Sequence, residues 1–524
     1  MGIYVNPGNN KLFVDKDDDN YVDKTLLLSV LNKKINKKER FVCVSRPRRF
    51  GKTMAANMIA AYYSKGCDSH EIFSDLEISK DPSFEEYINK YTVIKIDMND
   101  IVTNKGILTA SNFINERVIA ELKEEFPLIE FTNNSTLALA IQDIYKKTGE
   151  QFVFVIDEYD VIMRDELYSS DLKDYLRLLI SLFKSETTNT AISLAYFTGI
   201  LPVIKDKTQS GLNNITEYSM FDAFNMEPYV GFTEEEVKKL CNKANMDFDE
   251  LKRWYDGYSL NRLEIYSPKS VIEAIKQKSC DCYWALTGTY MSIRDLIQMN
   301  FEGIEKDVIK LIAGGRVEFE PHTFNNKMSD IKCKNDVFTC LVHLGYLGFN
   351  RVDSYIKECF IPNYEIKTEW IRTIKVTPGY KSVMEYINNS KDLLKATWEK
   401  DEEAVSKMVE KTHMEVTSNL TYNNEGSFQS AIRLAYFYAD SYYTIVNELP
   451  AGKGYADIAF IPYVKDVPAM IIELKKDKTP DTGLEQIKRK EYPAILEKYK
   501  DNLLLVAISY DSKTKEHYCI IEKG

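Results

Sequence analysis

The chain has 524 residues, of which 28% are charged and 44% hydrophobic, and this composition is typical of folded proteins rather than disordered or fibrous ones. Its length predicts about three domains, and no stretch approaches the ~18 consecutive apolar residues of a membrane-spanning helix. The net charge of −11 argues against a basic coat for nucleic acid, although it does not exclude a local basic channel.

The cysteine pattern bears on the cellular compartment of the protein, and the histidine pattern on whether it binds zinc. The nine cysteines are dispersed without C-x-x-C pairs, and the five histidines show no metal-ligand spacing. The N-terminal residues lack the basic and apolar segments of a secretory signal. We therefore expect reduced thiols, a cytoplasmic protein, no zinc site and no membrane association.

In the first third of the chain, apolar runs alternate with helical stretches. The alternation predicts an α/β fold with a parallel sheet covered by helices on both faces. Strands are expected at residues 41–44, 92–96, 152–156 and 192–197, and helices at 54–65, 107–123 and 172–185.

A phosphate loop is predicted between the first strand and its helix. The segment after Ser45 is Arg46, Pro47, Arg48, Arg49, Phe50, Gly51, Lys52 and Thr53. Backbone N–H groups at a helix start and a lysine attract phosphate, and the threonine hydroxyl suits a nucleotide-bound Mg²⁺. The pattern G-x-x-x-x-G-K-T departs at its first glycine, where this chain has Arg46.

An acidic strand end completes this prediction. The strand at 152–156 runs into Asp157 and Glu158. Asp157 is expected to join the Mg²⁺ shell, and Glu158 to orient and deprotonate the attacking water. Thr198, where the strand at 192–197 ends, is a candidate contact to that water or to the γ-phosphate, or else only caps a turn.

Beyond residue 232 the pattern changes to short helices. Residues 232–244 begin with a threonine cap and an acidic first turn. Residues 254–263 are turn-rich, and helices at 304–313 and 337–344 precede strands at 346–350 and 355–361. This order predicts a mostly helical middle with a winged-helix-like module, followed by a charged helical segment at 391–412.

The last part of the chain has the order helix, three strands, helix, strand. The segments are residues 426–440, 443–448, 456–461, 469–474, 484–498 and 502–508. On the third strand Glu473 and Lys475 face the same side, and a hairpin would bring Asp457 beside them. Two carboxylates can hold Mg²⁺ while a lysine positions or activates water. Glu-x-Lys alone is more typical of a solvated edge strand, but Asp457, the glycines before it and the surrounding α/β order favour the site.

Two further residues are candidates for the same pocket. Gln486 lies on the helix predicted to cover this strand, and Glu425 begins the preceding helix. Either side chain has an ordinary alternative in helix capping or surface exposure.

Taken together, these motifs resemble a family of bacterial AAA-ATPase-like proteins with a C-terminal PD-(D/E)xK nuclease superfamily domain. The resemblance rests on the segments YVDKT from Tyr21, SRPRRFGKT, VIDEYD, FTG with Gly199, SGLNN, AGKGYADIAFIP after Glu448, AMIIELKKDK and LEQIKRKEY. It implies a Walker A and Walker B ATPase core, a helical lid, a winged-helix-like middle and a restriction-endonuclease-like fold. In that family an arginine at the position of Arg46 is usual.

We therefore predict three domains, at residues 1–228, 229–375 and 376–524. The expected function is ATP binding and hydrolysis coupled to Mg²⁺-dependent cleavage of nucleic acid, DNA rather than RNA, with room for a homo-oligomer. The alternative is an ATP-driven regulatory or binding switch, whose nuclease-like domain grips nucleic acid or protein without cutting.

Overall fold

The computed structural model describes residues 2–131, 136–203, 212–284, 293–416, 425–451, 454–489, 496 and 499–524. The chain divides into two compact units. Unit 1 consists of Met1–Leu296 with Glu318–Glu369, and unit 2 of Ile297–Val317 with Trp370–Gly524.

Unit 1 contains a five-stranded parallel sheet with the strand order β2-β3-β4-β1-β5. Its strands are β1 (Phe41–Ser45), β2 (Thr92–Asp97), β3 (Phe152–Asp157), β4 (Ile192–Gly199) and β5 (Thr216–Tyr218). β4 lies between β1 and β3, so the strand before the phosphate loop and the strand before Glu158 are not direct neighbours. All strands end at the same edge, where parallel sheets place their ligands.

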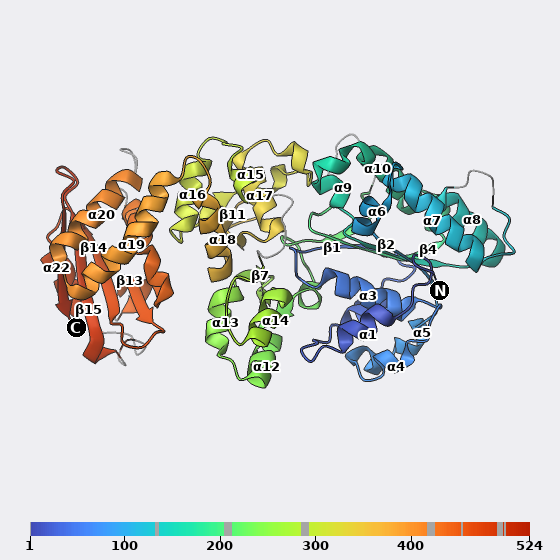
Figure 1. The fold of residues 1–524 in the computed structure, drawn as a ribbon, viewed down its shortest axis with the longest axis horizontal. Coiled ribbons are helices and arrows are strands. Elements are labelled where there is room, and N and C mark those ends of the chain that lie inside the picture. The colour runs from blue at the N-terminus through green and yellow to red at the C-terminus, as the bar shows by residue number, and fades with distance from the viewer. Residues whose placement is uncertain are drawn as a thin grey trace. The chain divides into compact units, whose positions relative to one another are not determined.

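Helices cover both faces of this sheet (Figure 1). One face packs against α6 (Met98–Asn104), α7 (Ala110–Glu125), α8 (Leu137–Thr148), α9 (Val161–Arg164) and α10 (Leu172–Phe183). The other carries α3 (Lys52–Tyr63), with α1 (Asn10–Lys16), α4 (His70–Phe73) and α5 (Phe84–Tyr87) beyond it. Unit 1 also contains α2 (Leu26–Asn32) and α11 (Glu186–Asn189). Because both faces are covered, β1, β3 and β4 are buried throughout, which explains their continuous apolar sequences.

A small helical region follows the sheet. It contains β6 (Phe232–Thr233), α12 (Glu234–Ala244), α13 (Phe248–Tyr255), β7 (Tyr258–Leu260), β8 (Leu263–Tyr266) and α14 (Pro268–Gln277). The predicted cap is confirmed: Thr233 and Glu236 form a reciprocal capping box at the start of α12. The turn-rich segment at 254–263 contains the end of α13 and most of an antiparallel β7–β8 hairpin.

The winged-helix-like order is present in the middle of the chain. The elements are α15 (Ile293–Ile297), α16 (Ile304–Ile312), β9 (Val317–Phe319), α17 (Lys334–Leu344), β10 (Gly348–Arg351), β11 (Lys357–Phe360) and α18 (Tyr364–Lys375). The sheet order is β10-β11-β9, with β10 and β11 antiparallel. Residues 336–344 of α17 are all buried, so this helix is not presented for insertion into a nucleic-acid groove.

Unit 2 contains a five-stranded mixed sheet with the order β12-β13-β14-β15-β16. The elements are α19 (Lys381–Glu399), α20 (Glu402–Val416), α21 (Glu425–Ala435), β12 (Tyr443–Ala451), β13 (Gly454–Pro462), β14 (Ala469–Lys476), α22 (Pro480–Arg489), β15 (Leu503–Tyr510) and β16 (His517–Lys523). Only β14 and β15 are parallel. The predicted order of helix, three strands, helix, strand is confirmed, and β16 extends it. Alternate strand residues form one core with α19–α21 and another with α22.

The charged segment at 391–412 is helical, as predicted, and it is divided between α19 and α20. Lys400 adopts a left-handed conformation, with φ of 61°, and ends α19. The side chain of Asp401 then accepts the Ala404 N–H at 3.0 Å and caps α20.

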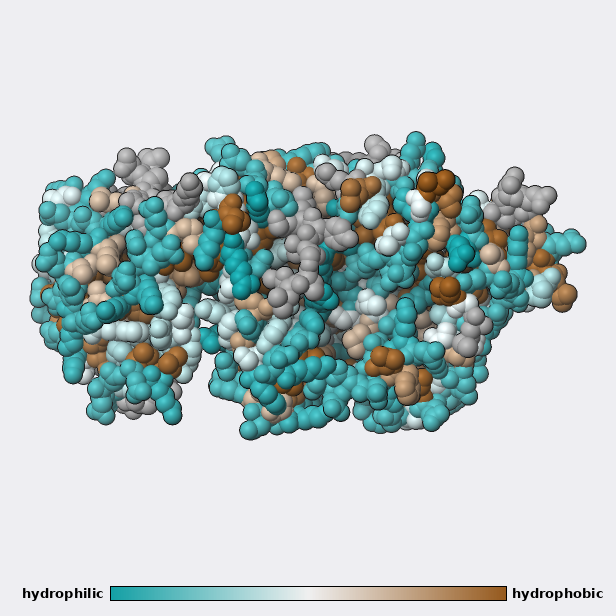
Figure 2. All heavy atoms as spheres, in the orientation of Figure 1, coloured by the Kyte–Doolittle hydropathy of each residue, from teal (hydrophilic) through white to brown (hydrophobic). Residues whose placement is uncertain are grey.

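The surface is largely hydrophilic on the face shown in Figure 2, with hydrophobic residues in small scattered groups. Within the described residues, none of the helices has the length and apolar character needed to cross a membrane. All nine cysteines are described residues, and no disulfide joins any two of them.

Candidate functional site

The phosphate loop joins β1 to α3, and its backbone requires special conformations. Gly51 has φ of 85° and Arg49 has φ of 69°, both in the left-handed region. The turn therefore depends on Gly51, which alone among these residues adopts such a φ without strain. The Lys52 ammonium donates to the Pro47 carbonyl at 2.9 Å and lies 3.7 Å from Glu158.

Arg46, at the position of the absent first glycine, has its side chain inside the protein. Its Nη1 donates to the carbonyl oxygens of Ser45 at 2.8 Å and Tyr218 at 2.9 Å, and its backbone N–H donates to Gly199. Burial lowers the pKa of Arg46 to about 10. The arginine thus connects β1 to β5, and the hydrogen bonds of its side chain are directed away from the loop.

The two carboxylates after β3 differ in environment. Burial raises the pKa of Asp157 to about 6, aided by the charge of Glu158 and opposed by a hydrogen bond from Thr53. Burial would also raise the pKa of Glu158, but the charges of Lys52, Arg164 and Arg48 outweigh it and lower that pKa. Glu158 itself has a φ of 50°, a strained conformation of the kind found at functional sites.

The phosphate loop and Glu158 border one cavity of about 510 Å³. Its walls include Arg48, Arg49, Gly51, Lys52, Thr53, Met54, Asn99, Val102, Thr103, Glu158, Arg164 and Tyr168. Four cationic side chains and one carboxylate line it, so the cavity is chemically suited to an anion with several negative charges.

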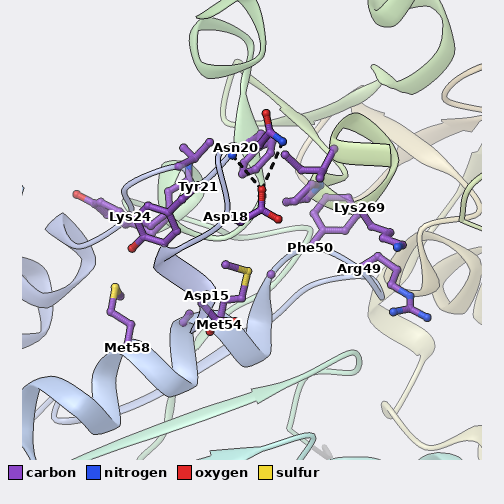
Figure 3. Close-up of a pocket in the computed structure, with 18 of the residues that line it drawn as sticks. Asp15, Asp18, Asn20, Tyr21, Lys24, Arg49, Phe50, Met54, Met58 and Lys269 are labelled. Carbon is purple, nitrogen blue, oxygen red and sulfur yellow. Dashed lines mark hydrogen bonds between the residues drawn. The ribbon is translucent and has the colours of Figure 1, made fainter. Parts of the chain in front are cut away.

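A second cavity, of about 460 Å³, lies beside the same loop (Figure 3). Arg49, Phe50, Gly51 and Met54 belong to its lining, together with Tyr21, Met58 and residues of α14. Asp18 accepts the backbone N–H of Asn20 and bonds Lys276 of α14 at 2.6 Å. This cavity is more apolar than the first, although charged side chains such as Asp15, Lys24 and Glu273 also line it.

Thr198 lies in register with Val44 near the C-terminal end of β4. Its side chain is fully buried, and its hydroxyl has no hydrogen-bond partner among the described residues. Its carbonyl accepts the Tyr159 N–H at 3.0 Å. The structure therefore places Thr198 at the edge where the strands end, between the phosphate loop and Glu158.

The carboxylate–lysine site lies on the face of the C-terminal sheet that α22 covers. On β14, Ile472 and Leu474 face the opposite core, so Glu473 and Lys475 face α22. Asp457 lies on the neighbouring strand β13, next to Ile458, which pairs with Ile472. Asp457 accepts the Leu474 N–H at 2.7 Å. Lys475 donates to the fully buried Glu473 at 2.9 Å. The predicted hairpin thus brings the three side chains to one place.

Gln486 joins this site from α22, where its Nε2 donates to Glu473 Oε1. Gly483 lets the helix approach, because a Cβ there would lie 3.2 Å from the Cβ of Ala507 and 3.4 Å from Lys475 Cγ. The side chain of Glu425 lies outside the described part of the structure. Among the described residues, there is no group of three or more His, Cys, Asp or Glu side chains that could hold a metal ion.

Two segments of the chain match models of known protein families. Residues 12–208 match the family model "Predicted AAA-ATPase", and residues 423–518 match that of the PD-(D/E)XK nuclease superfamily. The chain joins an AAA-ATPase-like domain to a PD-(D/E)XK nuclease superfamily domain. The predicted family and domain order are thus confirmed.

One curated relative is an uncharacterized protein in the vnfD 5′ region of Azotobacter chroococcum mcd 1. It is 25% identical over 293 residues, which are 54% of this chain and 53% of the relative, so the chain matches about half of its length. A structure of the Aeropyrum pernix ORC2 protein in ADPNP–ADP complexes is 11% identical, covering 68% of this chain and 96% of that one. Its TM-score is 0.31, which establishes neither a shared fold nor a shared function.

Several residues of the AAA-ATPase-like domain were not predicted from the sequence. Asn99 and Thr103 of α6 and Arg164 of α9 line the cationic cavity. Asp97, in register with Asp157, adds a carboxylate whose pKa is raised by burial. The signal for Asp97 was its place at the end of a buried strand, whereas α6 and α9 carried no motif.

Proposed function

We propose that the AAA-ATPase-like domain binds and hydrolyses Mg²⁺–ATP. The observation that carries this proposal is one cavity whose lining includes Lys52, Thr53 and Glu158, with Asp157 hydrogen-bonded to Thr53. The Thr53 hydroxyl and the Asp157 carboxylate are hard oxygen donors, which suit Mg²⁺. The triphosphate would occupy the cationic cavity, and the adenosine the apolar cavity beside Phe50 and Met54.

Each residue then has a chemical task. Lys52 would exchange its contacts with Pro47 and Glu158 for phosphate oxygens, and the loop N–H groups would bind beside it. Glu158 would orient a water molecule and take its proton, and Thr198 would contact that water or the γ-phosphate. Mg²⁺, when bound, neutralises negative charge on the phosphate oxygens.

For the PD-(D/E)XK domain we propose Mg²⁺-dependent cleavage of nucleic acid phosphodiester bonds, DNA more than RNA. Asp457 and Glu473 would hold the metal ion, and a bound metal ion activates water and stabilises phosphate charge. Lys475 would position the attacking water, while Gln486 orients Glu473. Because the described residues include no third His, Cys, Asp or Glu ligand at this site, water or backbone oxygens would complete the coordination shell.

The domain boundaries at 1–228, 229–375 and 376–524 are part of the same proposal. The first domain would hold nucleotide, the third would hold nucleic acid, and the middle would transmit nucleotide state between them. Coupling of this kind typically amounts to about 1–3 kcal/mol.

The test is a cleavage assay on plasmid, linear DNA and RNA, with Mg²⁺, in the presence of no nucleotide, ATP or ADP. ATP hydrolysis is measured in the same samples. We expect the wild type to hydrolyse ATP and to cut DNA, and Asp457→Asn to stop cutting while ATP hydrolysis continues, because a neutral amide is a poor ligand for Mg²⁺.

If the wild type hydrolyses ATP and binds nucleic acid but cuts no substrate, the domain acts as the nucleotide-driven binding switch instead. Equal cleavage by Asp457→Asn and wild type would remove Asp457 from the site. Thermal melting and nucleotide binding of each variant confirm that it is folded.

A further inference from the structure

The mechanism proposed above leaves three residues near Glu158 unexplained. They are Asp160, the last residue of VIDEYD, Arg164, at the end of α9, and Gly199, at the end of β4. Asp160 is fully buried, the Arg164 side chain is 7% exposed, and both belong to unit 1 with the phosphate loop. Two buried, oppositely charged groups beside a proposed active site call for a physical explanation, because burying charge is costly.

Asp160 is anchored to the end of β4. Its Oδ2 accepts the backbone N–H groups of Ile200 at 3.1 Å and Leu201 at 2.8 Å. Gly199 makes this approach feasible, because a Cβ at that position would collide with Asp160 Oδ1. The carboxylate therefore has a fixed position set by the sheet rather than by its own helix.

Arg164 connects this anchor to the proposed base. Its Nε lies 2.7 Å from Asp160 Oδ2, and its Nη2 donates to Glu158 Oε2 at 2.5 Å. Arg164 also lines the cationic cavity together with Lys52 and Arg48. Because Nε and Nη2 belong to one rigid planar guanidinium, the contact of Nε with Asp160 restricts where Nη2 can place the Glu158 carboxylate.

We propose that Arg164 is a positioning residue for ATP hydrolysis: held by Asp160, it fixes the Glu158 carboxylate in the cavity so that it faces the attacking water. This inference rests on the proposed ATPase function and adds a contact that the phosphate-loop pattern does not contain. Lys52, 3.7 Å from the other side of Glu158, leaves it to bind phosphate, whereas Arg164 stays because Asp160 holds it.

The test is a double-mutant cycle on ATP hydrolysis with the full chain. Arg164→Ala is expected to lower kcat by roughly 10–100-fold and to leave KM within about threefold, as for a positioned base that loses its orientation. Arg164→Lys, which keeps the charge but has one nitrogen in place of Nε and Nη2, should recover part of the loss. Arg177→Ala, which removes an exposed arginine paired with Asp174 on α10, is the matched control and should behave as the wild type.

The decisive measurement is Arg164→Ala combined with Glu158→Gln. Because Arg164 acts through Glu158, the double variant should be no slower than Glu158→Gln alone. A merely structural role would lower the melting temperature and slow the Glu158→Gln background as well. If Arg164→Ala does not fold, Arg164→Lys takes its place in the cycle.

Two results for kcat would overturn the inference while leaving the ATPase proposal intact. One is a wild-type kcat in Arg164→Ala, and the other is a double variant whose fold-loss in kcat is the product of the two single losses. A rise in KM at unchanged kcat would also overturn it, because Arg164 would then bind phosphate rather than position Glu158. Absence of hydrolysis by the wild type would instead reject the ATPase proposal itself, and this inference with it.

Discussion

The two proposed sites of this chain are built from opposite charge patterns. The phosphate-loop cavity presents Arg48, Arg49, Lys52 and Arg164 around a single lining carboxylate, Glu158. The C-terminal site places two carboxylates, Asp457 and Glu473, beside one lysine. The first is suited to receive a polyanion and the second a metal cation, although each has a lysine bonded to, or near, a glutamate.

The two sites also differ in how they are assembled. The C-terminal trio comes from two antiparallel neighbours, where strand alternation and one hairpin register set which side chains meet. The phosphate site collects residues from the loop after β1 and the start of α3, from the end of β3, and from α6 and α9, which are far apart in the sequence. A local pattern can therefore specify the second site almost fully, but only parts of the first.

The largest expected effect is the loss of cleavage on removing Lys475, which distinguishes this lysine from Lys52 of the phosphate loop. Lys475→Ala should lower nucleic-acid cleavage by roughly 10³-fold, the loss typical of removing a group that stabilises or positions the reacting atoms, and should leave ATP hydrolysis unchanged. Cleavage rates on linear DNA measure the effect. The control is Lys488→Ala, which removes an exposed lysine of α22 that pairs with Glu522 of β16. Undiminished cutting by Lys475→Ala would contradict the assigned role.

The reciprocal change is Lys52→Ala. Loss of a charge-assisted contact to phosphate should weaken ATP binding by roughly 10²-fold, without preventing Mg²⁺-dependent cleavage in the absence of nucleotide. Titration with a fluorescent ATP analogue gives the affinity. Lys146→Ala, at an exposed position in the last turn of α8, should bind as the wild type does. Unchanged affinity in Lys52→Ala would remove the loop from the nucleotide site.

Metal removal should affect the two sites unequally, and at the phosphate site its effect should be smaller than that of Lys52→Ala. Excess EDTA should stop cleavage completely, because the carboxylate site acts only through a metal ion. Nucleotide should still bind, about tenfold more weakly, since Lys52 and the loop N–H groups remain. Mg²⁺ or Mn²⁺ should restore both activities. Equal loss at the two sites would break the contrast between an anion site and a cation site.

Strongly patterned elements of the fold were predictable from sequence. The buried strands β1, β3 and β4 are continuous apolar runs, and β14 carries the alternation that locates Glu473 and Lys475. β5 escaped prediction because three edge residues carry too little pattern to distinguish a strand from a loop. The break at Lys400 also escaped it, because a left-handed cap at a lysine has no signal of its own in a charged segment.

The phosphate loop, the acidic end of β3 and the trio of Asp457, Glu473 and Lys475 could be predicted from the sequence, because each lies within one element or one hairpin and follows a local period. Two contacts could be found only in the folded structure: Arg46 donates to the Tyr218 carbonyl at the sheet edge, and Asp160 accepts the N–H groups that follow β4. Those contacts join residues 40 to 172 positions apart, and sheet order, not local periodicity, brings such residues together.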